Sequence, residues 1–333
     1  MNQANNSKCV LTFGELLMRL DAPPPHRFAQ SSSFNTTFTG GEANVAVALS
    51  QWGIPTRILS KVPAHDLGES CVNHFQRYGV DAQYVVRGGE RLGILFVESG
   101  AGPRSPQVIY DRNHSAFRTI TPIEVDWDAA FKGASWFHFT GTAPALGDSV
   151  RNTLQAAISI AQERQIPISF DCSYRSALWS IEEARKHFQP LLHEADVFFG
   201  SESDAATFFD VHERGEACFN ALRDKYNLSC LAFTERRTTK NGDQEYCGRA
   251  LKGNEFAATN WQRLHIVDRI GAGDAFAAGI IRGLLNTYAL SETVDFATAA
   301  AILAHTIPGD FLLATKGEVD SFTASGPAKR GWR

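Results

Sequence analysis

Apolar and polar positions alternate along the chain in segments that predict strands and helices in turn. Residues 9–13 (Cys-Val-Leu-Thr-Phe) are apolar or β-branched and stop at Gly14, which predicts a first strand and a turn. A helix ending near Gly53 and Pro55 is predicted by one apolar stripe at positions i, i+3, i+4 and i+7: Val45, Ala48, Leu49 and Trp52. The chain therefore opens on a strand, a loop and a helix.

The same alternation returns in the second half of the chain. Apolar residues at helical spacing between Val150 and Ala161 predict a helix, and residues 166–170 predict a buried strand that runs to Asp171. A strand at 197–199, a helix from about Glu202 and a strand at 230–233 follow. Strands separated by helices indicate an α/β fold, a doubly wound and mostly parallel sheet flanked by helices.

One region breaks this alternation and predicts a β-hairpin. Residues 92–98 and 108–110 are two strand-like runs joined by a Gly/Pro/Ser turn from Gly100 to Pro106. Together with residues 15–38 the hairpin would form a small β lid, inserted at about 15–38 and 91–116 in one domain of residues 1–325. An edge hairpin without a moving role is the alternative. We expect residues 326–333 to be a frayed tail.

Composition and charge narrow the class of protein. The chain has 333 residues, 44% of them hydrophobic, which is enough for one large or two modest cores. A net charge of -4 and a pI near 6.2, without a basic stripe, argue against nucleic acid as a partner. The polar residues 1–8 lack a signal-peptide core, and no apolar run reaches the ~18 residues that span a bilayer. These features predict a cytoplasmic protein that binds no membrane, and the six dispersed cysteines indicate no disulfide scaffold.

Polar residues with chemical potential follow several predicted strands directly. Residues 171–175 follow one strand, Ser201 follows another and Thr234 a third. Ligands of open α/β sheets bind at this edge, because loops and helix N-termini converge there. We therefore expect the site at the carboxyl ends of the strands.

The segment 267–279 carries the strongest local signal. Apolar residues repeat at helical spacing after Asp274, so Gly271 and Gly273 lie at the entrance of a helix. The free N–H groups of such a helix end bind anions, and glycines let a phosphate approach closely. Asp274 beside this site fits a base that takes a proton from an attacking hydroxyl, although a carboxylate that only caps the helix is the alternative. Within the helix, Gly279 and Gly283 indicate close packing against a neighbouring element.

Other signatures of nucleotide or hydrolytic chemistry are missing from the sequence. It contains no P-loop motif, no G-x-G-x-x-G after the first strand, no histidines at metal-ligand spacing and no G-x-S-x-G elbow. P-loop, zinc-hydrolase and serine-hydrolase interpretations therefore have little support.

Two motifs resemble the signatures of the ribokinase-like (PfkB) carbohydrate kinases. Residues 267–279 resemble the C-terminal signature D-T-x-G-A-G-D-x-F-x-x-G, with Arg269 in place of the usual Thr. Residues 40–46 resemble the N-terminal signature G-G-x-x-x-N-x-A. Segments 13–20, 110–116, 171–179 and 305–311 are similar to strings of the subgroup that phosphorylates 2-keto-3-deoxygluconate (KDG).

The resemblance implies a set of site residues. It makes Asp274 the base, assigns stabilisation of the transferring phosphoryl group to Gly271, Ala272 and Gly273, and gives the sugar site the following residues: Glu15, Gly40, Gly41, Asn44, Tyr110, Arg112 and Arg175. Arg112 and Arg175 suit an acidic sugar on physical grounds, because guanidinium pairs carboxylate in a bidentate way. Two solvated surface arginines are the alternative.

The nucleotide end departs from the family pattern. Residues 201–204 (Ser-Glu-Ser-Asp) stand where the family usually has N-x-x-E, and residues 234–239 replace its G-x-x-G. The expected ATP-binding residues are Ser201, Thr234, Arg236, Gly271, Gly273 and His305, the last of which has a core histidine as its alternative. Asp204 is the candidate near Mg²⁺, and Asp268 is the candidate for a monovalent cation, K⁺, on which the family often depends.

The resulting hypothesis is transfer of the ATP γ-phosphoryl group to the primary hydroxyl of KDG, giving the 6-phosphate, with Mg²⁺ carried by the nucleotide. Alternatives are another PfkB kinase, acting on fructose, ribose or another keto-deoxy sugar acid, and a catalytically silent sugar-binding protein. A protruding lid would pair between subunits, so we expect a homo-oligomer.

Overall fold

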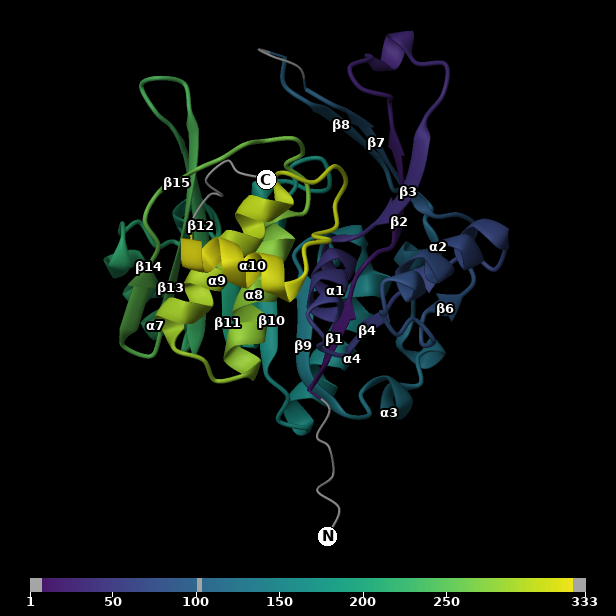
Figure 1. Cartoon of the computed structure of the whole chain (residues 1–333). Helices are drawn as coiled ribbons and strands as arrows, with labels where there is room; N and C mark the ends of the chain where they lie inside the picture. Colours follow the sequence, from purple (N-terminus) through teal and green to yellow (C-terminus); the bar gives the residue numbers. More distant parts are fainter. Residues whose placement is uncertain (1–7, 101–103, 326–333) are drawn as a thin grey trace.

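The computed structural model describes residues 8–100 and 104–325, and a large, mostly parallel sheet is the centre of its fold (Figure 1). The strand order is β14-β13-β12-β11-β10-β9-β1-β4, and β15 pairs with β13. The run from β12 to β4 is parallel, whereas β13 and β14 are antiparallel to their neighbours. The strands are β1 (Cys9–Phe13), β4 (Thr56–Leu59), β9 (Ala134–Thr140), β10 (Ile168–Asp171), β11 (Val197–Gly200), β12 (Cys230–Thr238), β13 (Gln244–Lys252), β14 (Glu255–Ala258) and β15 (Gln262–Arg263).

Helices cover both faces of this sheet, because its strands are apolar on both sides. In β1, Phe13 packs into one core and Val10 into the other. The first face carries α4 (Asp148–Glu163), α5 (Ile181–His193), α6 (Glu202–Phe208) and α7 (Glu216–Tyr226). The second face carries α1 (Gly41–Gln51), α8 (Ala272–Leu285), α9 (Leu290–Ala304) and α10 (Lys316–Ser325). Three layers result, as the sequence predicts.

A separate four-stranded sheet rises above the carboxyl edge of the large one (Figure 1). Its order is β3 (Asn35–Thr39), β2 (Leu17–Asp21), β7 (Gly93–Glu98) and β8 (Gln107–Asp111). β7 and β8 form the predicted antiparallel hairpin, although residues 101–103 of its turn lie outside the described residues. Beside its base lie α2 (Asp66–Arg77) and a short pair of strands, β5 (Lys61–Val62) and β6 (Val86–Arg87).

Two strand boundaries differ from the sequence prediction. β10 begins at Ile168 rather than at residue 166, because Pro167 has no N–H to donate to the ladder. β12 continues past residue 233 to Thr238 and pairs with β13 in a long hairpin. The added residues are polar and mostly exposed, so no apolar alternation announces them.

The two glycines inside α8 permit its close contact with α9. A Cβ on Gly279 would lie 2.5 Å from the Cα of Ala297, and one on Gly283 would lie 2.2 Å from Cγ2 of Thr293. Real Cβ atoms do not approach so closely, so larger residues would push the helices apart. The packing role predicted for these glycines is confirmed.

Two negative findings concern the described residues only. None of their helices combines the length and apolar character needed to cross a bilayer. The six cysteines are all buried and none is in a disulfide. The predicted frayed tail, 326–333, lies outside the described residues.

Candidate active site

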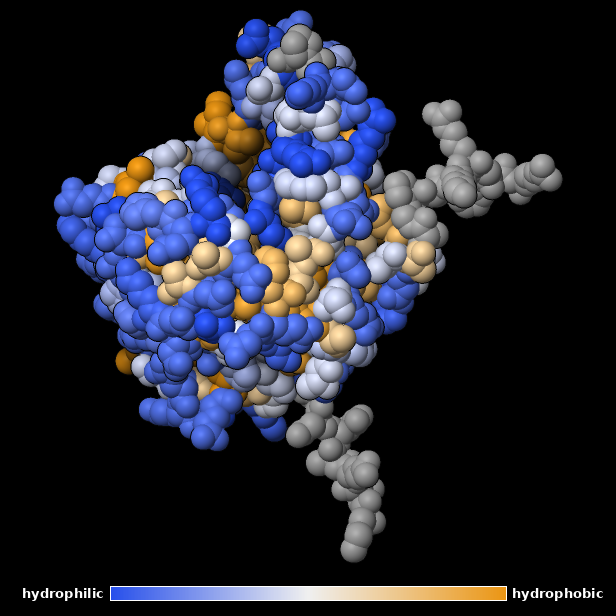
Figure 2. Space-filling view, turned by 90° about the vertical axis from the view of Figure 1, so that its left-hand side faces the viewer, coloured by the Kyte–Doolittle hydropathy of each residue, from blue (hydrophilic) through white to orange (hydrophobic). Residues whose placement is uncertain are grey.

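A pocket of about 730 Å³ lies at the carboxyl edge of the large sheet, below the four-stranded sheet. Figure 2 shows the surface hollowed where this smaller sheet meets the body. Thr140 and Asp171, the last residues of β9 and β10, line the pocket on the body side together with Thr234, which lies within β12 rather than after it. Leu17, Leu95, Val108 and Tyr110 line it from the four-stranded sheet. The predicted edge is therefore where the chain forms its cavity.

The N-terminus of α8 forms part of the pocket wall. Gly271 is the N-cap with φ 82°, and a Cβ there would lie 1.9 Å from the carbonyl oxygen of Asp310. A residue with a side chain fits neither this φ nor this contact. A Cβ on Gly273 would meet nothing within 4 Å, so this backbone faces open space, whereas Ala272 is buried. The first N–H groups of the helix are thus open to an anion.

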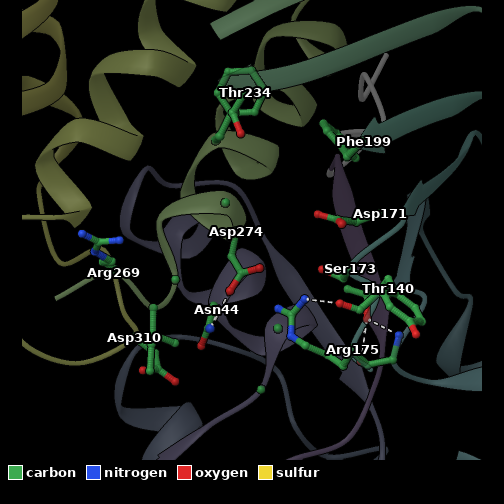
Figure 3. Close-up of a pocket in the computed structure, with 18 of the residues that line it drawn as sticks. Asn44, Thr140, Asp171, Ser173, Arg175, Phe199, Thr234, Arg269, Asp274 and Asp310 are labelled. Carbon is green, nitrogen blue, oxygen red and sulfur yellow. Dashed lines mark hydrogen bonds between the residues drawn. The ribbon is translucent and has the colours of Figure 1, made fainter. Parts of the chain in front are cut away.

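Asp274 lies one residue further along, at the base of the pocket (Figure 3). Its Oδ2 accepts a hydrogen bond of 2.7 Å from Nδ2 of Asn44 in α1. Burial raises the pKa of Asp274 to about 8, Asp171 and Asp310 add to the rise, and Asn44 and Arg175 oppose it. Since the N-cap is Gly271 and the carboxylate is held by another helix, capping does not account for Asp274.

Gly40 and Gly41 keep the space beside this carboxylate open. A Cβ on Gly40 would lie 2.5 Å from the carbonyl oxygen of Glu15, so the two backbones touch. A Cβ on Gly41 would lie 3.8 Å from Oδ1 of Asp274 and would occupy the volume in front of it. The absence of a side chain thus permits the close backbone contact at Gly40 and leaves the volume beside Asp274 open at Gly41.

Arg112 is a nearly buried cation that lines the pocket directly after β8. Its side chain is 10% exposed, its Nε lies 3.5 Å from Oε2 of Glu15, and its guanidinium lies over the Tyr110 ring at 4.9 Å. Neither Nε nor Nη1 has a hydrogen-bond partner among the described residues. Burial raises the pKa of Glu15 and the positive charge of Arg112 opposes this rise. Glu15 is therefore placed behind Arg112 rather than on the pocket surface.

Arg175 and Asp171 line the pocket at the carboxyl end of β10 (Figure 3). Arg175 is exposed and its Nη1 donates to the carbonyl oxygen of Tyr174 over 2.9 Å. Burial raises the pKa of Asp171 to about 6, while Arg175 lowers it. The two arginines thus approach the cavity from different elements.

The residues expected at the nucleotide end are only partly brought together. Ser201, Asp204, Thr234 and Arg236 all line the pocket. The Ser201 hydroxyl donates to Asp204 Oδ2 over 2.6 Å and accepts from its backbone N–H over 3.1 Å, so this pair caps α6. His305 differs from the expectation: it is 0% exposed, packs against Tyr246 and has Nδ1 2.7 Å from the Ala301 carbonyl oxygen. It is a core residue and does not line the pocket.

Asp268 does not offer the free oxygen that a K⁺ ligand needs. Oδ1 accepts from the backbone N–H groups of Arg269 and Ile270, at 2.7 and 3.1 Å. Oδ2 accepts from Nη2 of Arg19 at 2.8 Å and from the N–H of Gly309 at 3.2 Å. Four donors use the four lone-pair positions of a carboxylate. The geometry thus argues against the monovalent-cation role expected for Asp268.

Two residues of the pocket, and one buried acid that binds a pocket residue, were not predicted from the sequence. Asp310 and Thr39 line the cavity and are hydrogen-bonded to each other. Glu42 is buried and does not line the pocket, but it accepts from both Oγ1 and N of the lining residue Thr140, at 2.7 and 3.0 Å, and so fixes the end of β9. Asp310 and Glu42 had a sequence signal only through their positions inside the strings 305–311 and 40–46, and Thr39 lies outside both strings.

In the pocket, a carboxylate lies beside a helix N-terminus that begins with glycines, at the carboxyl edge of an α/β sheet. This combination of fold and site is that of a phosphotransferase. The model of a family described as pfkB family carbohydrate kinase matches residues 7–311. The chain belongs to this family and is a carbohydrate kinase.

Three relatives show how far the similarity extends. The crystal structure of 2-dehydro-3-deoxygluconokinase from Thermotoga maritima is 36% identical, with a TM-score of 0.92, and the match covers 95% of this chain and 98% of that one. The 2-dehydro-3-deoxygalactonokinase of Haloferax volcanii is 29% identical over 96% of this chain and 98% of its own. The 2-dehydro-3-deoxygluconokinase of Bacillus subtilis is 28% identical over 95% of each.

Proposed function

We propose that this enzyme transfers the γ-phosphoryl group of ATP to the primary hydroxyl of KDG, giving KDG 6-phosphate and ADP. The observation that carries the proposal is Arg112, whose buried guanidinium borders the pocket with two nitrogens lacking a hydrogen-bond partner. Buried donors of this kind are costly unless a ligand satisfies them. A carboxylate is the acceptor that matches a guanidinium in charge and shape.

The surroundings of Arg112 support an acidic rather than a neutral sugar. Glu15 approaches Nε of Arg112 at 3.5 Å, and Nη1 has no hydrogen-bond partner among the described residues. Arg175 adds a second cation to the lining of the pocket. A neutral hexose would leave both guanidinium groups without a counter-charge, and that cost would fall on binding. The keto-acid end of KDG supplies the counter-charge.

Phosphoryl transfer then follows from the placement of Asp274. Its carboxylate takes the proton of the sugar hydroxyl, the hydroxyl oxygen forms a bond to the γ-phosphorus, and the bond from that phosphorus to the β,γ-bridging oxygen breaks. The N–H groups after Gly271 stabilise the negative charge on the transferring group. A base works best with a pKa near the working pH, which a value of about 8 satisfies.

The nucleotide is held on the far side of Asp274 from the sugar. Thr234 and Arg236 lie on the wall of the hairpin β12–β13, and Ser201 lies at the end of β11. Asp171 and Asp204 are the carboxylates that would face Mg²⁺ carried by ATP, and their raised pKa values indicate that they gain from a nearby cation. Bound Mg²⁺ neutralises charge on the phosphates.

The four-stranded sheet acts as a lid over the sugar in this proposal. Leu17, Leu95, Val108 and Tyr110 face the cavity from it, and closure would exclude water from the reacting groups.

The exposed Ile109 of this sheet would gain from burial against a second copy, so we also propose a homo-oligomer, which sedimentation velocity tests. We place the enzyme in the cytoplasm, where its substrate ATP is available.

The names of the relatives favour a 2-keto-3-deoxy sugar acid and leave two epimers. The Thermotoga maritima and Bacillus subtilis proteins are named for the gluconate form, and the Haloferax volcanii protein for the galactonate form. Phosphorylation of 2-keto-3-deoxygalactonate is therefore the second candidate function.

An ADP-release screen tests the proposal. The panel holds KDG, its galactonate epimer, fructose and ribose, and NMR of the product locates the phosphate. KDG should give the highest kcat/KM and a 6-phosphate. Preference for a neutral sugar would refute the acid-sugar assignment, and sugar binding without ADP release would favour a silent binding protein.

A further inference from the structure

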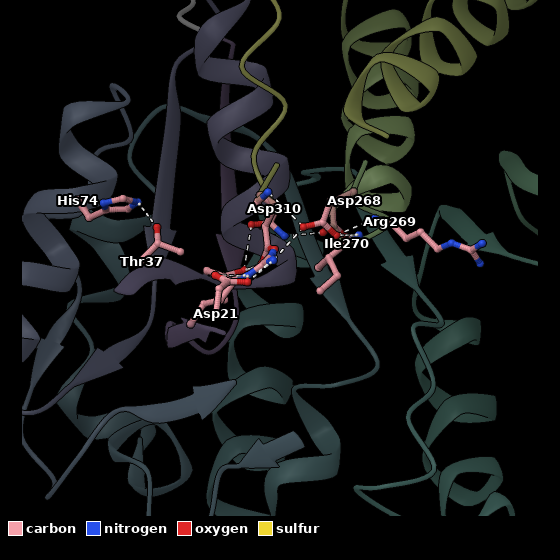
Figure 4. Close-up of polar contacts among 12 residues, drawn as sticks. Asp21, Thr37, His74, Asp268, Arg269, Ile270 and Asp310 are labelled. Atoms are coloured by element: carbon pink, nitrogen blue, oxygen red, sulfur yellow. Dashed lines mark hydrogen bonds and ion pairs between the residues drawn. The ribbon is translucent and has the colours of Figure 1, made fainter. Parts of the chain in front are cut away.

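Arg19 of β2 is a buried cation at the junction of the two sheets. Its side chain is 2% exposed, and its guanidinium meets three carboxylates (Figure 4). Nε and Nη2 bind Asp21 at 2.9 and 2.7 Å, Nη2 also binds Asp268 at 2.8 Å, and Nη1 binds Asp310. All three nitrogens of this side chain contact carboxylates, and two of these acids, Asp268 and Asp310, come from distant parts of the sequence.

The partners of Arg19 belong to the two loops that shape the N-terminus of α8. Asp268 organises the loop that leads into the helix through the N–H groups of Arg269 and Ile270. Asp310 belongs to the loop that follows α9, and its backbone touches Gly271 so closely that a Cβ there would lie 1.9 Å away. The phosphate-binding turn is therefore held in place from both sides by residues that Arg19 bridges.

The four-stranded sheet is fixed by the same contacts. Arg19 lies on β2, and Thr39 at the end of β3 donates a hydrogen bond to Oδ2 of Asp310. Residues from two neighbouring strands of this sheet thus bind the same carboxylate, that of Asp310. Any displacement of the sheet at this point moves Asp310, and with it the backbone against Gly271.

The buried carboxylate of Asp310 depends on the positive charge of Arg19. Asp310 is 2% exposed, burial raises its pKa, and Arg19 is the first of the groups that oppose the rise. Removing a partner from a buried ion pair leaves an uncompensated charge. Lys can replace only part of this arrangement, because a single ammonium does not present the planar fork that joins separate carboxylates.

We propose that Arg19 is a positioning residue for phosphoryl transfer, joining the four-stranded sheet to both loops that hold the N-terminal turn of α8. It touches neither the base nor the space beside Asp274, and acts through Asp268 and Asp310. The proposal rests on phosphoryl transfer at α8, which Asp274→Asn tests separately.

The test compares Arg19→Gln and Arg19→Lys with Arg57→Gln. Arg57 is a matched control: it is 13% exposed, pairs with Asp81 at 2.9 Å and binds the Ala130 carbonyl oxygen at 2.7 Å, at the start of β4. The kcat and both KM values are measured well below the Tm of each variant. Arg19→Gln should lower kcat by about 10²-fold, as expected when reacting groups are displaced by about 1 Å.

Arg19→Lys should lower kcat by an intermediate factor, since the ammonium keeps the charge but joins fewer carboxylates. It also keeps the test decisive if Arg19→Gln does not fold. Arg57→Gln should lose Tm while its kcat stays within about threefold of the parent, which is about 0.65 kcal/mol of barrier. The proposal is overturned if every Arg19 variant that folds loses only Tm and keeps kcat as Arg57→Gln does.

Discussion

Nδ2 of Asn44 donates a hydrogen bond of 2.7 Å to Oδ2 of Asp274, and this bond joins the first turns of α1 and α8. The two residues are 230 positions apart in the sequence. The bond stabilises the ionised carboxylate, while burial and two neighbouring acids oppose ionisation. Asn44 therefore orients Asp274 and lowers its pKa against the larger rise that burial causes.

Asp274→Asn should remove the base and leave the nucleotide site intact. We expect turnover to fall by about 10²–10⁴-fold, the usual contribution of a positioned general base. ADP release gives the rate, and calorimetry should show ATP affinity close to that of the parent. Retained turnover would refute the assignment of Asp274, and would leave the Arg19 proposal without its site.

The pH profile of kcat/KM for the sugar should have an acidic limb that reports the ionisation of Asp274. A base is inactive while protonated, so log kcat/KM for the sugar should rise with pH until the group with a pKa of about 8 is ionised. Asn44→Ala removes a hydrogen bond that lowers this pKa, so its limb should lie at higher pH. A limb that stays in place in Asn44→Ala would contradict the link between the two residues.

Arg112→Gln should weaken recognition of an acid and spare a neutral analogue. We expect the KM for KDG to increase by a much larger factor than the KM for ATP, because the lost charged hydrogen bonds are worth about 1.5–3 kcal/mol. An analogue with an alcohol in place of the carboxylate serves as the control. Equal losses for acid and alcohol would show that Arg112 does not bind the carboxylate.

Arg175→Ala should likewise raise the KM for KDG more than that for ATP.

Activity should not depend on K⁺. All lone-pair positions of Asp268 are used by protein donors, so a cation finds no free oxygen on this carboxylate. Replacement of K⁺ by tetramethylammonium at constant ionic strength should leave kcat unchanged. A marked loss of turnover in the absence of K⁺ would show that a cation competes with Arg19 for Asp268.

Gly279→Ala should destabilise the fold through the contact of α8 with α9. Its Cβ would lie 2.5 Å from the Cα of Ala297, and overpacking of this kind costs about 1–3 kcal/mol of unfolding free energy. Gly317→Ala in α10 is the control, because nothing lies within 4 Å of its Cβ. That variant should gain about 0.4–1 kcal/mol by restricting the unfolded chain. Denaturant unfolding measures both, and equal effects would refute the packing argument.

The sequence by itself determined the class of fold and the centre of the chemistry. Short, nearly continuous apolar runs at 9–13 and 197–199 indicated buried strands, and the stripe from Val45 to Trp52 indicated a helix, because the local pattern of apolar residues reflects which faces are buried. The glycines before Asp274 indicated an anion site, because a helix N-terminus is a local feature. Two short signatures were enough to indicate the family.

Only the tertiary structure decided how distant residues pair. His305 lies in the core and Asp268 is saturated with donors, whereas a sequence shows neither burial nor hydrogen-bond partners. The ion pairs of Arg19 with Asp268 and Asp310 span 249 and 291 positions. Such pairs depend on strand register and on the direction in which loops leave the sheet, and no local pattern encodes these.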